Sequence, residues 1–204
     1  LLVGILFFFF FETPGRPCHE CAGVIEQVAP RRAIQVLRPI EVRDHAKSIT
    51  LMPAPGFSVA FEIDFGGSVL AHQNLGIEFI NGNFKTDIAR ARTFGFLTDI
   101  ESLRERDLTL GGSIDNAVVM DEYRVLNEDG LRFKDEFVRH KILDAVGDLY
   151  LLGHCLIGEF TGYKSGHRLN NKLLRALLEQ EDHYEEVVFN DIKSSPVSYQ
   201  LAPS

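Results

Sequence analysis

Cysteine and positive charge are both scarce in this 204-residue chain, and tryptophan is absent. There are three cysteines, and 21 Lys and Arg residues face 29 Asp and Glu residues, which gives a net charge of −8. Three cysteines are too few for a disulfide scaffold and fit a reducing compartment, so a cytoplasmic location is expected. The acidic balance argues against broad nucleic-acid binding. A negative net charge still allows a few lysines, gathered at one place, to bind one small anion.

Long apolar runs are also rare, since the only one is Leu1 to Phe11, interrupted by Gly4. It is shorter than the roughly 20 residues that a membrane-spanning helix needs, so stable membrane insertion is not expected. A signal-peptide core has this length, but no Lys or Arg precedes the run. A buried strand is one alternative. Because the chain starts with Leu, we favour the damaged start of an incomplete chain.

The rest of the chain has the composition of a globular protein, with 45% apolar and 25% charged residues. Phe57 to Phe65 alternates strictly between apolar and other residues, which predicts a strand with one buried face. The clearest helices are expected over 135–152 and 165–178, joined by a strand over 156–163. Strands alternating with helices indicate a layered α/β or α+β domain. Further strands are expected over 33–42, 117–120 and 186–189, and short helices over 84–92 and 100–106.

The helix that begins at Asp135 separates into two faces. His140, Asp144 and Asp148 are spaced four residues apart and share the face opposite the apolar one, with Lys141 at its border. A His and an Asp one helical turn apart can reach the same divalent ion, so this spacing is compatible with a metal site. A solvated face of an amphipathic helix is the alternative.

The second group of candidate residues is Tyr163-Lys-Ser-Gly-His167, just before the next helix. Ser165 is a good N-cap, which would place His167 in the first helical turn. The free backbone N–H groups of such a turn favour a phosphate or a developing oxyanion beside the imidazole. A capping turn with an exposed histidine is the alternative.

Several longer motifs, in order along the chain, resemble a single family. They are Ala91-Arg-Thr-Phe-Gly-Phe96, Leu110-Gly-Gly-Ser113, the segment from Tyr123 to Phe133, Phe137-Val-Arg-His-Lys141 and Tyr163-Lys-Ser-Gly-His167. They resemble UDP-3-O-acyl-N-acetylglucosamine deacetylase, the zinc amidase that commits its substrate to lipid A synthesis. The resemblance runs from about Ala22 to the C-terminus, corresponding to the C-terminal two-thirds of the family pattern. It implies an α+β fold in which this chain supplies the second of two similar layered α/β sandwich domains.

The resemblance also implies a zinc cofactor and a role for each matching residue. His140 and Asp144 match two of the three zinc ligands. His167 matches the protonated histidine that stabilises the oxyanion and acts as general acid, and Asp148 matches the carboxylate that orients it. Thr93 matches the hydroxyl that helps to polarise the acetyl carbonyl. A carboxylate partner and a nearby diphosphate would raise the pKa of His167.

Substrate contacts carry over in the same way. Asp64 and Phe65 match the residues that bind the uracil, and the cations around the diphosphate are matched by Lys47, Lys141 and Lys164. Phe96 is also assigned to substrate binding. It opens a segment to Val119 that matches the family's inserted βαβ unit, whose apolar lining accepts the 3-O-acyl chain. The residues expected to line this acyl passage, with ordinary core as the alternative, are Leu97, Ile100, Ile114, Ala117 and Val119.

One family motif, His-x-x-Glu-His, is absent from these 204 residues. In the family it supplies the third zinc ligand and the general-base glutamate. We therefore expect a truncated chain, inactive alone, whose partner is the missing first domain. The expected division is a remnant of that domain over 1–32, the second domain over 33–190 with its acyl insert at 96–119, and a tail over 191–204. A non-catalytic module that binds the UDP and acyl groups is the alternative function.

Overall fold

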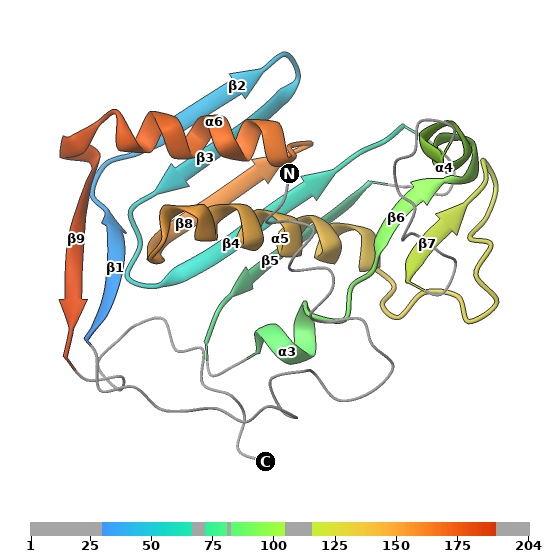
Figure 1. The fold of residues 1–204 in the computed structure, drawn as a ribbon, viewed down its shortest axis with the longest axis horizontal. Coiled ribbons are helices and arrows are strands. Elements are labelled where there is room, and N and C mark those ends of the chain that lie inside the picture. Colours follow the sequence, from blue (N-terminus) through green and yellow to red (C-terminus); the bar gives the residue numbers. More distant parts are fainter. Residues whose placement is uncertain (1–29, 67–71, 81–82, 105–115, 191–204) are drawn as a thin grey trace.

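The computed structural model describes residues 30–66, 72–80, 83–104 and 116–190. They form an α+β fold, as predicted, in which two helices lie on one face of a mixed β-sheet (Figure 1). No helix among these residues is long and apolar enough to cross a membrane. The strands of this sheet are β1 (Arg31–Val36), β2 (Ile40–Asp44), β3 (Lys47–Met52), β4 (Phe57–Ile63), β5 (Gln73–Glu78), β8 (Cys155–Tyr163) and β9 (Tyr184–Phe189).

Strand β8 organises the sheet. Its first residues pair in parallel with β1, and residues 159–163 pair with β3 on one side and, in parallel, with β4 on the other. β9 and β5 then extend the sheet beside β1 and β4. A side chain at Gly162 would bring a Cβ within 2.8 Å of the Phe61 ring and 2.9 Å of Ser165 Oγ. The absence of a side chain at Gly162 therefore allows this close packing where β8 ends.

Helices α5 (Glu136–Leu149) and α6 (His167–Leu178) form the second layer. α5 packs on β4 and β5, whereas α6 packs on β2 and β3, and the two helices contact each other (Figure 1). The alternation predicted for β4 is confirmed, because its odd-numbered residues are buried along the whole strand. The apolar stripe of α6, Leu169, Leu173 and Leu177, is buried as well. Burial of these matching apolar faces holds the two layers together.

A smaller βαβ unit stands at one end of the molecule (Figure 1). It consists of β6 (Thr93–Phe96), α4 (Leu97–Arg104) and β7 (Ala117–Met120), and the two strands pair in parallel. Asn127 accepts a hydrogen bond from the Val119 N–H and donates one to the Ala117 carbonyl, and so it anchors β7. These elements overlap the βαβ unit expected from 96 to 119, and the first strand begins at Thr93.

Some predicted elements differ from those observed. The single strand expected over 33–42 is two strands, β1 and β2, separated by a segment that contains Pro39. The helix expected over 84–92 is only α3 (Phe84–Asp87), and residues 88–90 form a turn. α5 ends at Leu149 and continues as one 3₁₀ turn, η1 (Tyr150–Leu152); a second turn, η2 (Glu181–His183), precedes β9. Strands β3, β5 and β6 were not predicted.

The prediction that Ser165 caps α6 is wrong. The N-cap residue is Gly166, and its extended backbone is followed by His167 as the first helical residue. Ser165 is buried, and its Oγ has no hydrogen-bond partner in the part of the chain that the structure describes. The hydroxyl lies beside Gly162 of β8. The first turn of α6 accordingly has no side-chain hydrogen bond at its N-cap. His167 nevertheless lies in that turn, as expected.

Candidate active site

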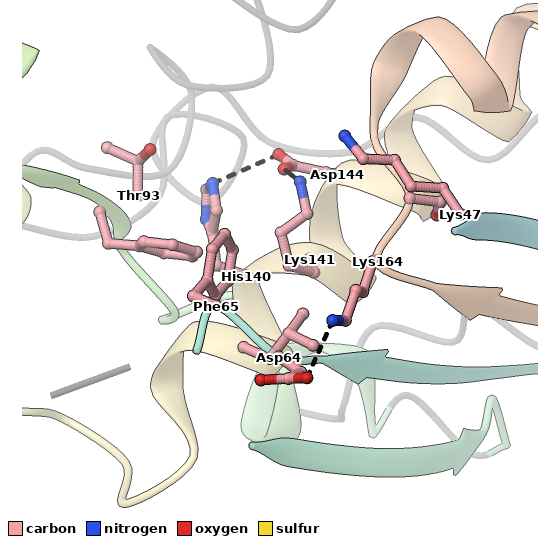
Figure 2. Close-up of a pocket in the computed structure, with 11 residues that line it drawn as sticks. Lys47, Asp64, Phe65, Thr93, His140, Lys141, Asp144 and Lys164 are labelled. Carbon is pink, nitrogen blue, oxygen red and sulfur yellow. Dashed lines mark hydrogen bonds and ion pairs between the residues drawn. The ribbon is translucent and has the colours of Figure 1, made fainter. Parts of the chain in front are cut away.

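A cavity of about 430 Å³ opens where the parallel strands β4 and β8 end (Figure 2). Carboxyl ends of parallel strands meet at one edge of a sheet, which is where open α/β sheets usually bind ligands. The first residues of β3 and β6 and one face of α5 complete the wall. The cavity is lined by Lys47, Ile63, Asp64, Phe65, Thr93, Phe94, His140, Lys141, Asp144, Lys164 and Ser165.

His140 and Asp144 project from adjacent turns of α5 into this cavity (Figure 2). His140 Nε2 lies 3.3 Å from Asp144 Oδ1, and their side chains are 5% and 13% exposed. Burial lowers the pKa of His140, so the imidazole is neutral at pH 7. Burial alone would raise the pKa of Asp144, but the neighbouring His140 and Lys141 lower it. The alternative of a solvated helix face is therefore wrong for these two residues.

Three lysines line the same cavity: Lys47 from β3, Lys141 from α5, and Lys164 directly after β8 (Figure 2). Lys141 Nζ lies 2.9 Å from Asp144 Oδ2, and Lys164 Nζ lies 2.8 Å from Asp64 Oδ2. The hydrogen bond from Lys164 lowers the pKa of Asp64, and the same bond raises the pKa of Lys164. Positive charge thus gathers locally in an acidic protein, which is the arrangement that a small anion requires.

His167 lies near Asp144, one of the lining residues, and its ring is held by Asp148. His167 Nδ1 lies 2.8 Å from Asp148 Oδ2, and because a carboxylate accepts, the ring nitrogen donates. That hydrogen bond raises the pKa of His167. His167 Nε2 lies 4.0 Å from Asp144 Oδ2, so the other ring nitrogen is close to the cavity residues. The buried amide of Asn170 also donates to Asp148 Oδ2, at 2.8 Å.

Aromatic side chains form one wall of the cavity. Phe65 is 51% exposed and meets Phe94 edge to face at 5.9 Å between ring centroids. Phe94 in turn contacts Phe137 at 5.0 Å and the His140 ring at 6.0 Å, both edge to face. Phe65 therefore has one edge anchored while its ring stays accessible, which suits stacking on a planar base.

The predicted acyl-passage residues lie apart from this cavity, around the βαβ unit. Leu97, at the start of α4, is 40% exposed, whereas Ala117 and Val119 on β7 are each 7% exposed. Phe96 is half-buried and packs against the main core. Ile100 lies against Gly95, where an added Cβ would be 3.5 Å from its Cγ1. Ile114 lies outside the described residues, so the passage stays a prediction.

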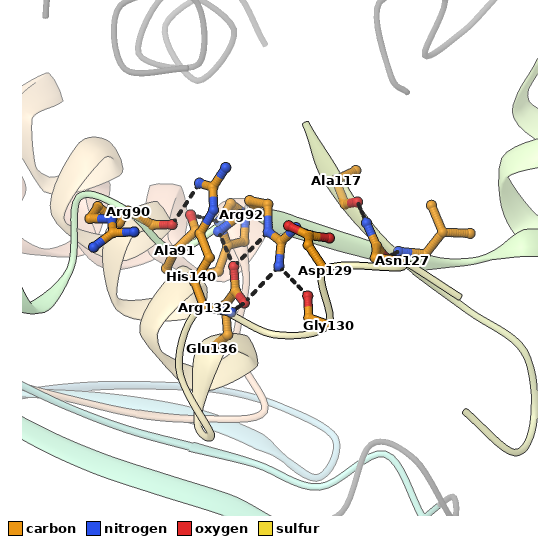
Figure 3. A network of polar contacts seen from close by, with 11 residues as sticks. Arg90, Ala91, Arg92, Ala117, Asn127, Asp129, Gly130, Arg132, Glu136 and His140 are labelled. Atoms are coloured by element: carbon orange, nitrogen blue, oxygen red, sulfur yellow. Dashed lines mark hydrogen bonds and ion pairs between the residues drawn. The ribbon is translucent and has the colours of Figure 1, made fainter. Parts of the chain in front are cut away.

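A buried ion pair beside the site was not predicted from the sequence (Figure 3). Arg92 and Glu136 are 1% and 0% exposed, and Arg92 Nε donates to Glu136 Oε1 at 2.9 Å. Burial alone would raise the pKa of Glu136, but hydrogen bonds from Arg92 and Arg132 lower it. Glu136 is four residues before His140, so its place on the same helix face could have been read from the spacing. Its pairing with Arg92 could not.

Two of the described residues have the chemistry of metal ligands. The pair His140–Asp144 combines a neutral imidazole with an ionised carboxylate, a donor set that zinc accepts. No group of three or more His, Cys, Asp or Glu side chains in the described ranges is placed to hold a metal ion. His140 and Asp144 therefore fit two positions of a zinc ligand set.

Comparison with known proteins gives the same family as the motifs. A family model described as UDP-3-O-acyl N-acetylglycosamine deacetylase matches residues 18–179. The UDP-3-O-acyl-N-acetylglucosamine deacetylase of Alcanivorax borkumensis is 56% identical, and that of Thioalkalivibrio sulfidiphilus is 54% identical, each over 88% of this chain. The chain spans 60% of the length of these relatives. It therefore belongs to the UDP-3-O-acyl-N-acetylglucosamine deacetylase family.

Proposed function

We propose that this chain takes part in the zinc-dependent hydrolysis of the N-acetyl group of UDP-3-O-acyl-N-acetylglucosamine, the committed step of lipid A biosynthesis. One observation carries the proposal: a single cavity joins the His140–Asp144 pair to three lysines, and His167 Nε2 lies 4.0 Å from Asp144 Oδ2. That combination suits an amide hydrolase acting on an anionic substrate. The low cysteine content supports a cytoplasmic location for the reaction.

Zinc would be held by His140 through Nε2 and by Asp144 through a carboxylate oxygen. When bound, zinc supplies Lewis-acid polarisation of the acetyl carbonyl and lowers the pKa of a bound water. Catalytic zinc sites usually have three protein ligands. The His-x-x-Glu-His motif that supplies the third in this family does not occur in the 204 residues. We therefore assign the third ligand and the general base to a domain that carries that motif.

His167 is proposed to hold and deliver the proton that the leaving amine needs. Its Nδ1–H is engaged by Asp148, so the proton that it can transfer is on Nε2, the nitrogen nearer to Asp144. The raised pKa keeps the ring protonated to higher pH than an ordinary histidine, so the same N–H can also stabilise a developing oxyanion. Thr93 lines the same cavity, and its hydroxyl would donate to the acetyl carbonyl.

The UDP part of the substrate is proposed to lie across the lysine side of the cavity. Phe65, with its accessible ring, would stack on the uracil, and Asp64 would accept a hydrogen bond from the base. Lys47, Lys141 and Lys164 would surround the diphosphate. Phe96 and the predicted acyl-passage residues would then receive the 3-O-acyl chain at the βαβ unit.

Zinc binding tests the metal assignment directly. The 204-residue chain should bind zinc weakly, because it supplies two ligands. His140→Ala should weaken that binding by about tenfold or more, since even residues behind the ligands are typically worth 10–100-fold. The measurement is competition with a chelator of known affinity. His72→Ala is the matched control, because His72 is 54% exposed, pairs with Glu62 and does not line the cavity. Equal affinities in wild type and His140→Ala would remove His140 from the site.

Binding of UDP tests the lysine cluster. Lys141→Ala and Lys164→Ala should each raise the Kd for UDP by roughly fivefold, equivalent to about 1 kcal/mol. The loss should be larger at low salt, because the Debye length falls from about 10 Å at 0.1 M to about 3 Å at 1 M. Lys172→Ala, an exposed lysine on the surface of α6, is the control. Calorimetry at the two salt concentrations would detect the difference, and salt-independent binding would argue against the cluster.

Acetate release from the UDP-linked substrate separates catalysis from binding alone. We expect no release by the 204-residue chain with added zinc, and release when a family domain carrying His-x-x-Glu-His is supplied in frame or in trans. Asp144→Ala should abolish that activity. A non-catalytic module would bind UDP in both cases and release acetate in neither. Activity of the lone chain that depends on Asp144 would show that other residues within it complete the site.

A further inference from the structure

The peptide group between Ala91 and Arg92 is held at both ends by α5 (Figure 3). Its N–H donates to Glu136 Oε1 at 3.0 Å, and its carbonyl oxygen lies 3.3 Å from His140 Nδ1. Glu136 and His140 are four residues apart, so they project from the same face of the helix. A carbonyl oxygen can only accept, and therefore the contact requires the proton of the neutral ring to be on Nδ1. Nε2, which lies 3.3 Å from Asp144 Oδ1, is then the ring nitrogen that carries the lone pair.

Glu136 is itself held rigidly. It is 0% exposed, and Arg92 Nε and Nη2 donate to its two carboxylate oxygens at 2.9 and 3.2 Å. The Arg132 N–H donates to Oε2 at 2.6 Å. Arg92 is fixed in turn by the Gly130 carbonyl, which accepts from Nη2 at 2.7 Å. The carboxylate therefore has little freedom to turn away from the Ala91–Arg92 peptide group.

We propose that Glu136 is a positioning residue for His140, acting through the Ala91–Arg92 peptide group. Histidines that bind metals usually donate their second ring N–H to a carboxylate or a carbonyl, which sets the tautomer and the ring orientation. Here both kinds of partner are present, one behind the other. The Glu136 carboxylate accepts from the peptide N–H, and the carbonyl of the same peptide group accepts from the His140 ring. Hydrogen bonds linked in this way polarise one another, so the negative charge of Glu136 strengthens the carbonyl as an acceptor.

The same peptide group also sets the position of the next residue along the chain. Thr93 follows Arg92 and begins β6, with its side chain at the cavity. Restraint of the Ala91–Arg92 peptide by α5 therefore fixes the position of Thr93 relative to His140 in the cavity. This inference rests on the proposed role of His140 as a zinc ligand.

The test compares Glu136→Gln with Asp129→Asn in the 204-residue chain. Asp129 is the matched control, because it also receives a hydrogen bond from Arg92, at 3.1 Å, but is 67% exposed and does not contact the peptide group. The first readout is the ring ¹⁵N chemical shifts of His140 without metal, which report the tautomer. The second is the zinc Kd from chelator competition, and thermal unfolding checks that each variant is folded.

Wild type and Asp129→Asn should both show His140 protonated on Nδ1 and the same zinc Kd within about twofold. Glu136→Gln should populate the Nε2–H tautomer and raise the zinc Kd by about tenfold, the lower end of what such supporting residues contribute. A folded Glu136→Gln chain with an unchanged tautomer and Kd overturns the proposal. A wild-type His140 protonated on Nε2 also overturns the proposal, and this measurement does not depend on the folding of any variant. Zinc binding that His140→Ala leaves unchanged contradicts the proposed function instead, and the tautomer still tests the role of Glu136.

Discussion

Replacing Arg92 by leucine is expected to lower the free energy of unfolding by about 3–5 kcal/mol. Glu136 is 0% exposed, and Arg92 donates to both of its oxygens. Removal of the guanidinium leaves a buried carboxylate with the Arg92 and Arg132 backbone N–H groups but no opposite charge. It also leaves the Gly130 carbonyl without its donor at 2.7 Å. Breaking a buried pair costs far more than its net contribution, because the remaining charge stays desolvated.

Urea denaturation of wild type, Arg92→Leu and Arg32→Leu measures this effect. Arg32 pairs with Glu186 at 2.9 Å, but their side chains are 60% and 44% exposed, so its loss should cost less than about 1 kcal/mol. The dependence on urea concentration should stay the same in all three proteins, since a change would indicate a different unfolding transition. A loss for Arg92→Leu no larger than that for Arg32→Leu would show that the buried pair does not stabilise the fold.

The second large effect is expected for His167→Ala in the deacetylase reconstituted with a His-x-x-Glu-His domain. Turnover should fall by about 10²–10³, because general-acid and oxyanion roles are each typically worth this much. Zinc content should not change, since His167 is assigned no ligand role. Acetate release and metal analysis of the same samples give both values. A variant that loses its zinc would identify His167 as a ligand rather than an acid.

The pH profile gives a separate check on His167. An acid must be protonated to act, so activity should decline as pH rises through the pKa of His167. Asp148 raises that pKa through the hydrogen bond to Nδ1. In Asp148→Asn the pKa should fall toward the ordinary value of about 6.5, and the decline should move to lower pH. His45→Asn is the control: His45 is 97% exposed and has a positive φ, which asparagine tolerates. An unchanged pH profile in Asp148→Asn would show that Asp148 does not set the pKa of His167.

Much of the fold could be predicted from local patterns alone. The alternation in β4 and the apolar stripe of α6 identify elements that bury one face, and both are observed. Strands β3, β5 and β6 escaped prediction because short strands depend on pairing with neighbours, which is set by contacts distant in sequence. His140 and Asp144 are four residues apart, and in a helix that spacing is enough to place both side chains on one face.

The sequence by itself therefore determined the family, the main helices and the His140–Asp144 pair, because each depends on residues close together along the chain or on motifs read in order. The tertiary structure alone decided which distant groups meet. It brought three lysines from distant parts of the chain into one cavity, buried Ser165 away from the cap position, and joined Arg92 to Glu136. Such contacts depend on how strands end and helices cross, and a side chain buried by that packing must find a partner wherever the fold provides one.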